Sequence, residues 1–273
     1  MLSGNGDKDL GRHPTQLKTA DPNKSTTALR ALRVVEVLAE ARAPLSASEV
    51  ASIIETERST AYRMLMTLME AGYVVRDPRT RGYRLGYKIL KLSRGLLSDD
   101  ERTELIQECL REISSRTGEA VHYSVLDRDC AILVQRTKGT QLVAIDFHIG
   151  DRAALHCTSI GKLLLAYEDA TMIEAAIRQG LPKQARNTIT TPQRFRAELL
   201  KVRAQGYAYD DFEFADDMRC VAVPVFEASA KRPLGGISLS GPSSRFTLPK
   251  LRDLRDCAME AVNALSLRLR GQG

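Results

Sequence analysis

Residues 46–85 read SASEVASIIETERSTAYRMLMTLMEAGYVVRDPRTRGYRL, and this stretch decides the fold of the N-terminal part of the chain. Two short helical patterns are separated by a few polar residues, and a basic hairpin with a strong turn follows them. This order is typical of a winged helix-turn-helix, which places one helix in the major groove of DNA.

The net charge of the chain lies in the same region. Residues 24–94 contain 13 Lys and Arg against 7 Asp and Glu, an excess of +6. Residues 1–23 carry 3 of each sign and residues 95–273 carry 24 of each, so the whole-chain excess of +6 falls in one segment. Positive charge in this segment is what binding to the phosphate backbone of DNA requires.

A capping box and an amphipathic spacing define the two short helices. Ser46 offers an N-cap and Glu49 follows three residues later, which predicts a helix start after a first helix at 27–41. The next helix is predicted to open near Arg58 and to end at Gly72. Its predicted buried face consists of Ala61, Leu65 and Leu68, with Met64 and Met69 beside it.

Polar side chains outside that buried face are the candidate DNA contacts. Arg58 and Arg63 can reach guanine edges or phosphates, and the turn from Asp77 to Gly82 would present further arginines at a hairpin tip. The alternative is that these side chains form only a solvent-exposed helix face, but the neighbouring basic hairpin favours a role in DNA binding. The predicted DNA-binding residues are Ser46, Arg58, Ser59, Thr60, Tyr62, Arg63, Arg79, Arg81 and Arg84.

A connector and a second domain follow. Residues 85–98 are predicted to form a helix that is either a spacer or a dimer contact, and a further helix is predicted to end at Gly118. Strands are then predicted at 120–126, 130–136, 142–148, 207–210, 219–226 and 234–240, and helices at 159–167, 171–179, 192–205 and 249–269. Strands grouped with helices indicate an α+β domain with an antiparallel sheet.

Three segments of this second domain carry polar residues in a pattern that predicts a small polar pocket. The first, 156–162, is a polar turn that opens a helix whose first amides could receive a carboxylate. The second, 210–213, is acidic. The third, 238–242, places Ser238 and Ser240 on one face of a strand, with Cys220 on another predicted strand.

Composition argues against several other classes of protein. The five cysteines are scattered and form no C-x-x-C, and the four histidines show no ligand spacing, so no metal or other cofactor is predicted. His156 and Cys157 could in principle supply a base and a nucleophile, but sequence neighbours in a turn rarely face each other, so no enzyme is predicted. No apolar run is long enough to span a membrane and the N-terminus is no secretory signal, so a cytoplasmic protein is expected.

Several blocks along the chain, in this order, resemble the IclR (isocitrate lyase regulator) family of bacterial transcriptional regulators. The resemblance runs from about residue 27 to residue 269. The blocks are RSTAYRMLMTLMEAGYVVRD at 58–77, YRLGYKILKL at 83–92, HCTSIGKLLLA at 156–166, GYAYDDFEFADDMRCVAVPVF at 206–226 and GGISLSGPSSRFT at 235–247.

The resemblance implies an N-terminal winged helix-turn-helix, a linker helix and a GAF-like C-terminal domain that binds an effector. It implies homodimers or homotetramers on palindromic double-stranded operators, and small organic acids, aromatic acids included, as effectors. The effector-binding residues that it implies are Leu142, Ile145, Ser159, Ile160, Gly161, Asp210, Cys220, Ser238 and Ser240. The chain departs from the family at Asp217, where glycine is usual, and at Ala154, where proline is frequent.

The sequence therefore predicts a disordered tail at 1–23, a winged helix-turn-helix at 24–86, a linker helix at 87–101 and a GAF-like domain at 102–273. The predicted function is sequence-specific regulation of transcription under the control of a small organic acid. The alternative is a GAF-type ligand-binding module, or a cysteine-dependent enzyme, without a DNA function.

Overall fold

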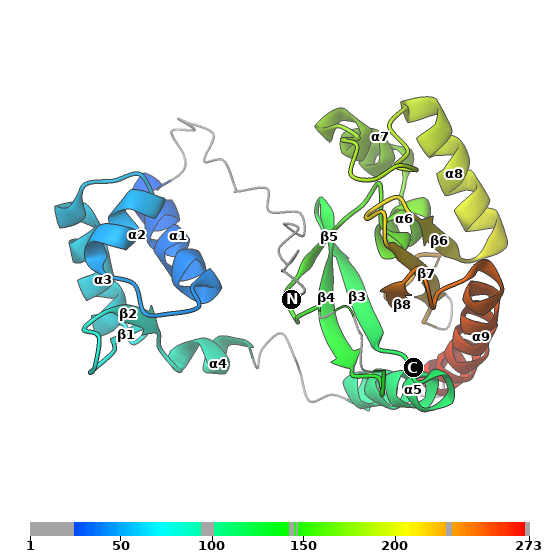
Figure 1. Ribbon diagram of the computed structural model, residues 1–273, viewed down its shortest axis with the longest axis horizontal. Coiled ribbons are helices and arrows are strands. Elements are labelled where there is room, and N and C mark those ends of the chain that lie inside the picture. Colours follow the sequence, from blue (N-terminus) through cyan, green and yellow to red (C-terminus); the bar gives the residue numbers. More distant parts are fainter. Residues whose placement is uncertain (1–24, 94–100, 142–144, 146, 228–230, 271–273) are drawn as a thin grey trace, which may run out of the picture. The chain divides into compact units, whose positions relative to one another are not determined.

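The computed structural model describes residues 25–93, 101–141, 145, 147–227 and 231–270. The chain divides into two compact units after residue 99 (Figure 1). The tail predicted at 1–23 lies outside the described residues.

The N-terminal unit is a helical core with a two-stranded antiparallel hairpin beside it. Its elements are α1 (Thr26–Glu40), α2 (Ala47–Ile53), α3 (Arg58–Glu70), β1 (Val74–Arg76), β2 (Tyr83–Leu85) and α4 (Lys88–Ser93). One apolar cluster joins the three larger helices to the hairpin, and its fully buried members are Val34, Val50, Ala61 and Leu65. The predicted winged helix-turn-helix pattern matches this arrangement.

Local signals in the sequence place the ends of these elements. The predicted capping box is present, since the Ser46 hydroxyl accepts from the Glu49 amide at 3.2 Å and the Glu49 carboxylate accepts from the Ser46 amide at 2.7 Å. Gly72 has a φ of +79° just after α3 and permits the turn into the hairpin. At Gly82 a Cβ atom would lie 2.8 Å from the Pro44 side chain, so the hairpin can approach the segment before α2 only with glycine there.

The connector helix begins later in the chain than the sequence predicts. A helix is expected over 85–98, but α4 begins at Lys88, because Leu85 belongs to the hairpin and the Gly86 amide bonds the Tyr73 carbonyl at 2.8 Å. Residues 94–98 of the predicted helix lie outside the described residues.

The C-terminal unit is an α+β fold built on a six-stranded antiparallel sheet, as predicted. The sheet order is β5-β4-β3-β8-β7-β6. The elements are α5 (Glu101–Thr117), β3 (Val121–Asp127), β4 (Cys130–Thr137), β5 (Arg152–Ala154), α6 (Ser159–Ala166), α7 (Ala170–Gln179), α8 (Pro192–Gln205), β6 (Ala208–Asp211), β7 (Met218–Val225), β8 (Gly235–Pro242) and α9 (Leu248–Arg270).

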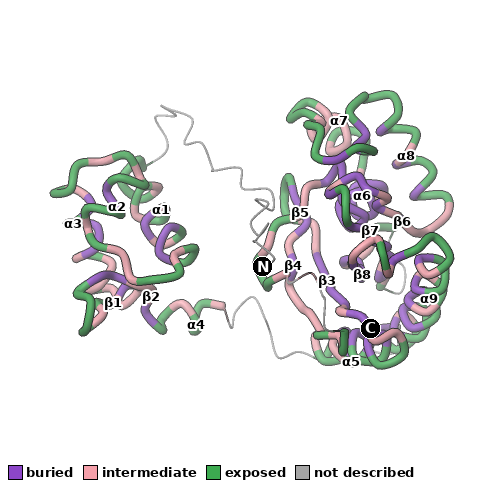
Figure 2. Tube along the Cα trace, in the orientation of Figure 1, coloured by how far each residue is buried: buried purple, intermediate pink, exposed green. Residues whose placement is uncertain are grey.

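The two faces of this sheet are covered by different helices (Figures 1 and 2). On one face, Val221, Val223 and Leu239 pack against α5 and α9. On the other face, Ala222 and Ala208 pack against α6 and α8. Because side chains alternate along a strand, Cys220 and the serines of β8 point to the second face, next to α6.

The prediction of a strand at 142–148 is wrong for the residues of this segment that the structure describes. Ile145, Phe147 and His148 lie in no strand, and residues 142–144 and 146 lie outside the described residues. The edge of the sheet is instead β5, whose residues 152–154 pair with Cys130–Ile132 of β4. No helix in the described part of the chain is long and apolar enough to cross a membrane.

Candidate functional sites

The first candidate site is the outer face of α3. Arg58, Ser59, Tyr62 and Arg63 are exposed, and Tyr62 keeps 49% of its surface accessible. Thr60, also predicted as a DNA contact, is only half exposed. The helix starts after Glu57, whose side chain makes no capping hydrogen bond to α3. Its first amides therefore point outward without a side-chain acceptor, beside two arginines.

The hairpin tip beside α3 is held by one carboxylate. Asp77 Oδ1 accepts from the Arg79 amide at 3.0 Å, from the Thr80 amide at 2.8 Å and from the Thr80 hydroxyl at 3.0 Å. These bonds, the Thr80 amide first, lower the pKa of Asp77, so it stays ionised and fixes the turn. Arg81 adopts a φ of +58° at the tip, and both Arg79 and Arg81 are exposed.

Two of the predicted contacts have other roles in the free protein. Ser46 uses its hydroxyl in the capping box of α2. Arg84 is half-buried, and its guanidinium lies 5.9 Å from the centre of the Tyr87 ring. Arg76 was not predicted as a contact, yet it is exposed and donates to the Arg81 carbonyl at 3.1 Å, so it adds to the charge of the tip.

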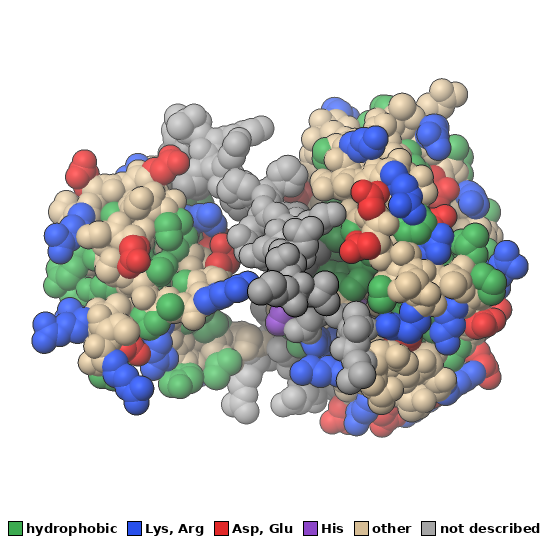
Figure 3. All heavy atoms as spheres, in the orientation of Figure 1, with side chains coloured by type: hydrophobic (Ala, Val, Ile, Leu, Met, Phe, Trp, Pro, Cys, Tyr) green, Lys and Arg blue, Asp and Glu red, His purple; other side chains and the backbone are tan. Residues whose placement is uncertain are grey.

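Figure 3 shows Lys and Arg side chains projecting from the part of this unit where the hairpin lies. We call the exposed side chains of α3 and the hairpin tip the basic surface, and define it as Arg58, Ser59, Tyr62, Arg63, Arg76, Arg79 and Arg81. All of its charged members are arginines, which suit phosphate oxygens and guanine edges.

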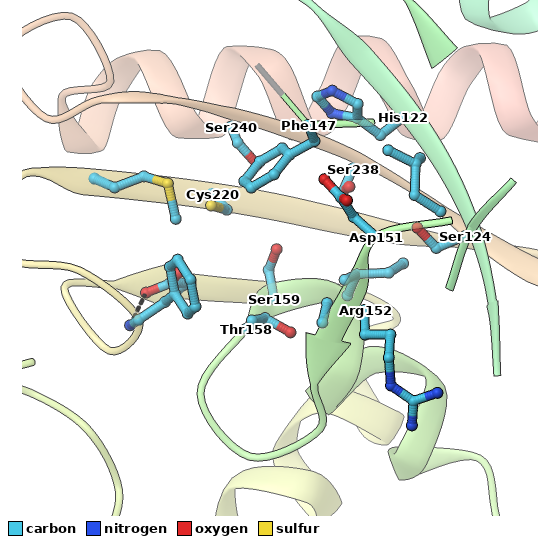
Figure 4. A pocket seen from close by; sticks show the side chains of 16 residues that line it. His122, Ser124, Phe147, Asp151, Arg152, Thr158, Ser159, Cys220, Ser238 and Ser240 are labelled. Carbon is cyan, nitrogen blue, oxygen red and sulfur yellow. Dashed lines mark hydrogen bonds between the residues drawn. The ribbon is translucent and has the colours of Figure 1, made fainter. Parts of the chain in front are cut away.

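The second candidate site is a pocket in the C-terminal unit, between the sheet and the start of α6 (Figure 4). Ser159 and Thr158 line one side, and Cys220, Ser238 and Ser240 line the other. Six predicted effector residues take part in the lining, namely Ser159, Ile160, Asp210, Cys220, Ser238 and Ser240.

Two of the other three predicted effector residues, Gly161 and Ile145, do not line the pocket. Gly161 packs against the chain instead, since a Cβ atom there would lie 2.3 Å from the Ala154 carbonyl oxygen. Ile145 packs against a small cluster of Ala215, Met218 and Cys220. Leu142 lies outside the described residues.

Several lining residues were missed by the sequence prediction. His122 and Ser124 stand two apart on β3, a spacing that places both side chains on one face of the strand. Their alternation was a usable signal, but only the packing of α6 decides which face holds the pocket. The remaining unpredicted lining residues are Leu133, Phe147, Asp151, Arg152, Ala153, Thr158, Phe214 and Met218.

Asp210 is the buried carboxylate of this pocket. Its side chain is inaccessible, and Oδ1 accepts from the Glu213 amide at 2.8 Å and from the Phe214 amide at 3.2 Å. Oδ2 accepts no hydrogen bond from any residue that the structure describes. Burial raises the pKa of Asp210 to about 6 against these bonds and the charge of Lys162.

A buried charge cluster lies next to Asp210. Lys162 of α6 is fully buried, and its ammonium group bonds Glu213 Oε1 and also Glu198 Oε1, the latter at 3.3 Å. Burial raises the pKa of Glu213 to about 7, although Lys162 acts in the opposite direction. The cluster ties the pocket helix to α8 and to the loop after β6.

The cysteines of this unit are poorly suited to act as nucleophiles. Burial raises the pKa of the Cys157 thiol to about 12 and that of Cys130 to about 11, and it raises the pKa of Cys220 well above its usual value. A thiol in such surroundings stays protonated at neutral pH and is unreactive. His156 bonds the Pro182 carbonyl rather than Cys157. No cluster of three His, Cys, Asp or Glu suited to a metal occurs among the described residues.

The two departures from the family pattern lie beside the pocket lining. Asp217 is exposed, and its carbonyl accepts from the Ser243 amide at 2.8 Å. Ala154 ends β5, and its carbonyl accepts from the Thr158 hydroxyl at 2.7 Å, which holds the turn into α6.

Comparisons with known proteins cover both units. The IclR helix-turn-helix domain matches residues 27–78, and the C-terminal domain of the bacterial transcriptional regulator IclR matches residues 97–267. The Pca regulon regulatory protein of Pseudomonas putida is 31% identical over 238 residues, which cover 86% of this chain and 81% of that protein.

Two solved structures share the fold. The structure of the Thermotoga maritima IclR is 28% identical and covers 89% of this chain and 98% of its own, with a TM-score of 0.72. An IclR homologue from Microbacterium hydrocarbonoxydans, solved in complex with 4-hydroxybenzoate, is 22% identical, with a TM-score of 0.74 and coverage of 89% and 100%.

Proposed function

The chain belongs to the IclR family of bacterial transcriptional regulators, and we propose that it binds operator DNA through its basic surface and a small organic acid through its pocket. The observation that carries this proposal is the separation of the two sites. An exposed arginine surface lies in one compact unit, and a largely apolar pocket with a few polar side chains lies in the other. We place the DNA-binding domain at 24–86, the linker at 87–101 and the effector domain at 102–273.

The DNA contacts divide into two kinds. Helix α3 enters the major groove with Arg58 and Arg63 toward base edges, and Ser59, Thr60 and Tyr62 supply hydrogen bonds. Arg79 and Arg81 at the hairpin tip contact the phosphate backbone, with Arg84 behind them. Ser46 contributes through the first amides of α2, which its capping box positions.

The effector is a small organic acid, aliphatic or aromatic. Its carboxylate lies at the start of α6, where the helix presents amides of Ser159 and Ile160 that precede the first intrahelical bond. The Thr158 hydroxyl already accepts from the Gly161 amide at 3.0 Å, so it orders this turn. The 4-hydroxybenzoate bound by the Microbacterium hydrocarbonoxydans homologue supports an acid of this size and kind.

The chain acts as a homodimer or homotetramer in the cytoplasm on a palindromic operator, because one recognition helix gains most affinity when it is paired. It regulates without catalysis, since its buried thiols are held protonated. Effector binding changes operator affinity only as far as the acid prefers one arrangement of the two DNA-binding units over the other.

An electrophoretic mobility shift with fragments flanking the gene tests this function. The full chain is expected to retard at least one fragment at physiological salt, and a panel of small organic acids is expected to change that retardation. Retardation of every fragment alike, or of none, would contradict regulated operator binding. The Ser240→Ala variant is expected to weaken the response to the acid.

A further inference from the structure

Asp210 offers the pocket an acceptor that the protein itself does not use. The carboxylate is fully buried, and two backbone amides of its own loop occupy Oδ1. Oδ2 accepts no hydrogen bond from any described residue. A buried carboxylate oxygen without a donor is costly, so it marks the place where a ligand donor would be stabilising.

The neighbours of Asp210 leave that oxygen to a ligand. Lys162 of α6 is already engaged by Glu213 and Glu198. The Cys220 thiol of β7 lies close enough to Asp210 to lower the pKa of the carboxyl group, but a thiol is a weak donor and compensates the buried oxygen poorly. Arg152 of β5 pairs with Asp129 at 2.8 Å, and Figure 4 shows its guanidinium turned away from the serines.

The same carboxylate repels a second carboxylate. An acidic effector therefore places its own carboxylate at the other side of the pocket, by Ser159 and the start of α6. Between the two sides, Phe147, Phe214 and Met218 offer apolar contact to the body of the ligand. The pocket is thus complementary to a molecule that carries a carboxylate at one end and a hydroxyl group at the other.

We infer that the effector is a carboxylic acid that also carries a hydroxyl group, and that Asp210 selects it by accepting the hydroxyl proton at Oδ2. This inference rests on the proposed effector site. An acid of the same shape without the hydroxyl leaves Asp210 desolvated and unpaired, so it binds at least about tenfold more weakly.

Calorimetric titration of the full chain at pH 7.5 tests the inference with matched probes. The pairs are glycolate and acetate, lactate and propionate, 3-hydroxybutyrate and butyrate, and 4-hydroxybenzoate and benzoate. In at least one pair the hydroxylated acid is expected to bind about tenfold or more tightly than its partner. Equal or tighter binding of the plain acids, or no binding of any hydroxylated acid at millimolar concentration, overturns the inference.

The Asp210→Asn variant tests whether Asp210 is responsible for the preference for hydroxylated acids. Asparagine keeps an oxygen for the two loop amides but replaces Oδ2 with a donor, so the preference is expected to fall to within about threefold. Asp217→Asn, an exposed change in the same loop, is the matched control and keeps the preference. If the Asp210→Asn variant still prefers the hydroxylated acids, Asp210 is not the residue that selects them. The affinities of the wild-type chain for the paired acids test the inference even if this variant does not fold.

Failure of this inference can be distinguished from failure of the proposed function. If plain acids release the chain from DNA and hydroxylated acids do not, the regulator stands and the selection by Asp210 fails. If the chain binds no DNA, the proposed function fails whatever the ratio within each pair.

Discussion

The basic surface and the pocket place their charges in opposite ways. The arginines of α3 and the hairpin tip are exposed and positioned by backbone turns, such as the one that Asp77 holds. The charges around the pocket are mostly buried, and Lys162 and Asp210 have no accessible surface. Exposed charges cost little in folding, whereas buried ones are strongly coupled to it. Substitutions at the DNA contacts should therefore have little effect on stability, whereas substitutions of the buried charges around the pocket should change stability strongly, in either direction.

The largest effect is expected from Lys162→Met. The change leaves the carboxylates of Glu213 and Glu198 without their buried cation, and the free energy of unfolding should fall by about 3–5 kcal/mol at pH 7.5. Urea unfolding of the full chain measures it. Lys201→Met, an exposed lysine 3.9 Å from Glu198, is the control and should change stability by about 0.5 kcal/mol or less. Equal losses in both variants would show that burial of the charge is not what matters.

The second-largest effect is expected from Asp210→Asn, which should raise the free energy of unfolding rather than lower it. Burial raises the pKa of Asp210 to about 6 from an ordinary value of 3.8, so the folded chain binds more protons than the unfolded chain between these values. This group therefore lowers the free energy of unfolding as the pH rises through that window, and the loss is complete above it. Asp210→Asn removes the loss and should stabilise the effector-free chain by up to about 3 kcal/mol at pH 7.5.

Unfolding curves at pH 4 and pH 7.5 check this sign. The difference between variant and wild type should be small at pH 4 and larger at pH 7.5. A variant that is less stable than wild type at pH 7.5 would show that the ionised carboxylate is compensated in the free protein.

On the basic surface, Arg63→Ala should act on binding alone. Loss of one contact to a base edge or phosphate should weaken operator affinity by about 1–3 kcal/mol, while stability changes by about 0.5 kcal/mol or less. Fluorescence anisotropy with labelled operator measures the affinity. Arg194→Ala removes an exposed charge from α8 of the other unit, and it should leave the affinity unchanged. Similar losses in both variants would indicate a general charge effect.

The smallest effect is expected at the hairpin tip. Arg79→Ala should weaken binding to all DNA sequences alike and reduce the slope of log affinity against log salt concentration by about 1. Anisotropy at several salt concentrations provides the slope. An unchanged slope would remove the tip from the backbone contacts.

Much of the fold could be predicted because its signals are local. The ends of α8 at 192 and 205 follow from a proline in its first turn and from Gly206, which adopts a φ of +79° after it. The capping box and the hairpin turn are local in the same sense. The strand expected at 142–148 has a suitable local pattern, but β5 takes the edge of the sheet by pairing with β4, and pairing between distant segments cannot be read from one strand.

The candidate pocket was predicted only in part for the same reason. The pattern of polar residues, together with the resemblance, supplied Asp210, Cys220 and the serines, all of which line the pocket. It gave no sign that Lys162 is buried, because its partners stand 36 and 51 residues away in the sequence. His122 and Ser124 carry a readable alternation, but the helix that covers their face decides their role.

The central claim is that the chain reads a DNA sequence through its basic surface. The most direct test is the ratio of its affinities for a palindromic fragment upstream of its target gene and for a scrambled fragment, measured by anisotropy at physiological salt. The account predicts that the operator binds at least about 10³-fold more tightly, and that Arg58→Ala with Arg63→Ala lowers this ratio sharply. Affinities for the two fragments that agree within a factor of ten would contradict it.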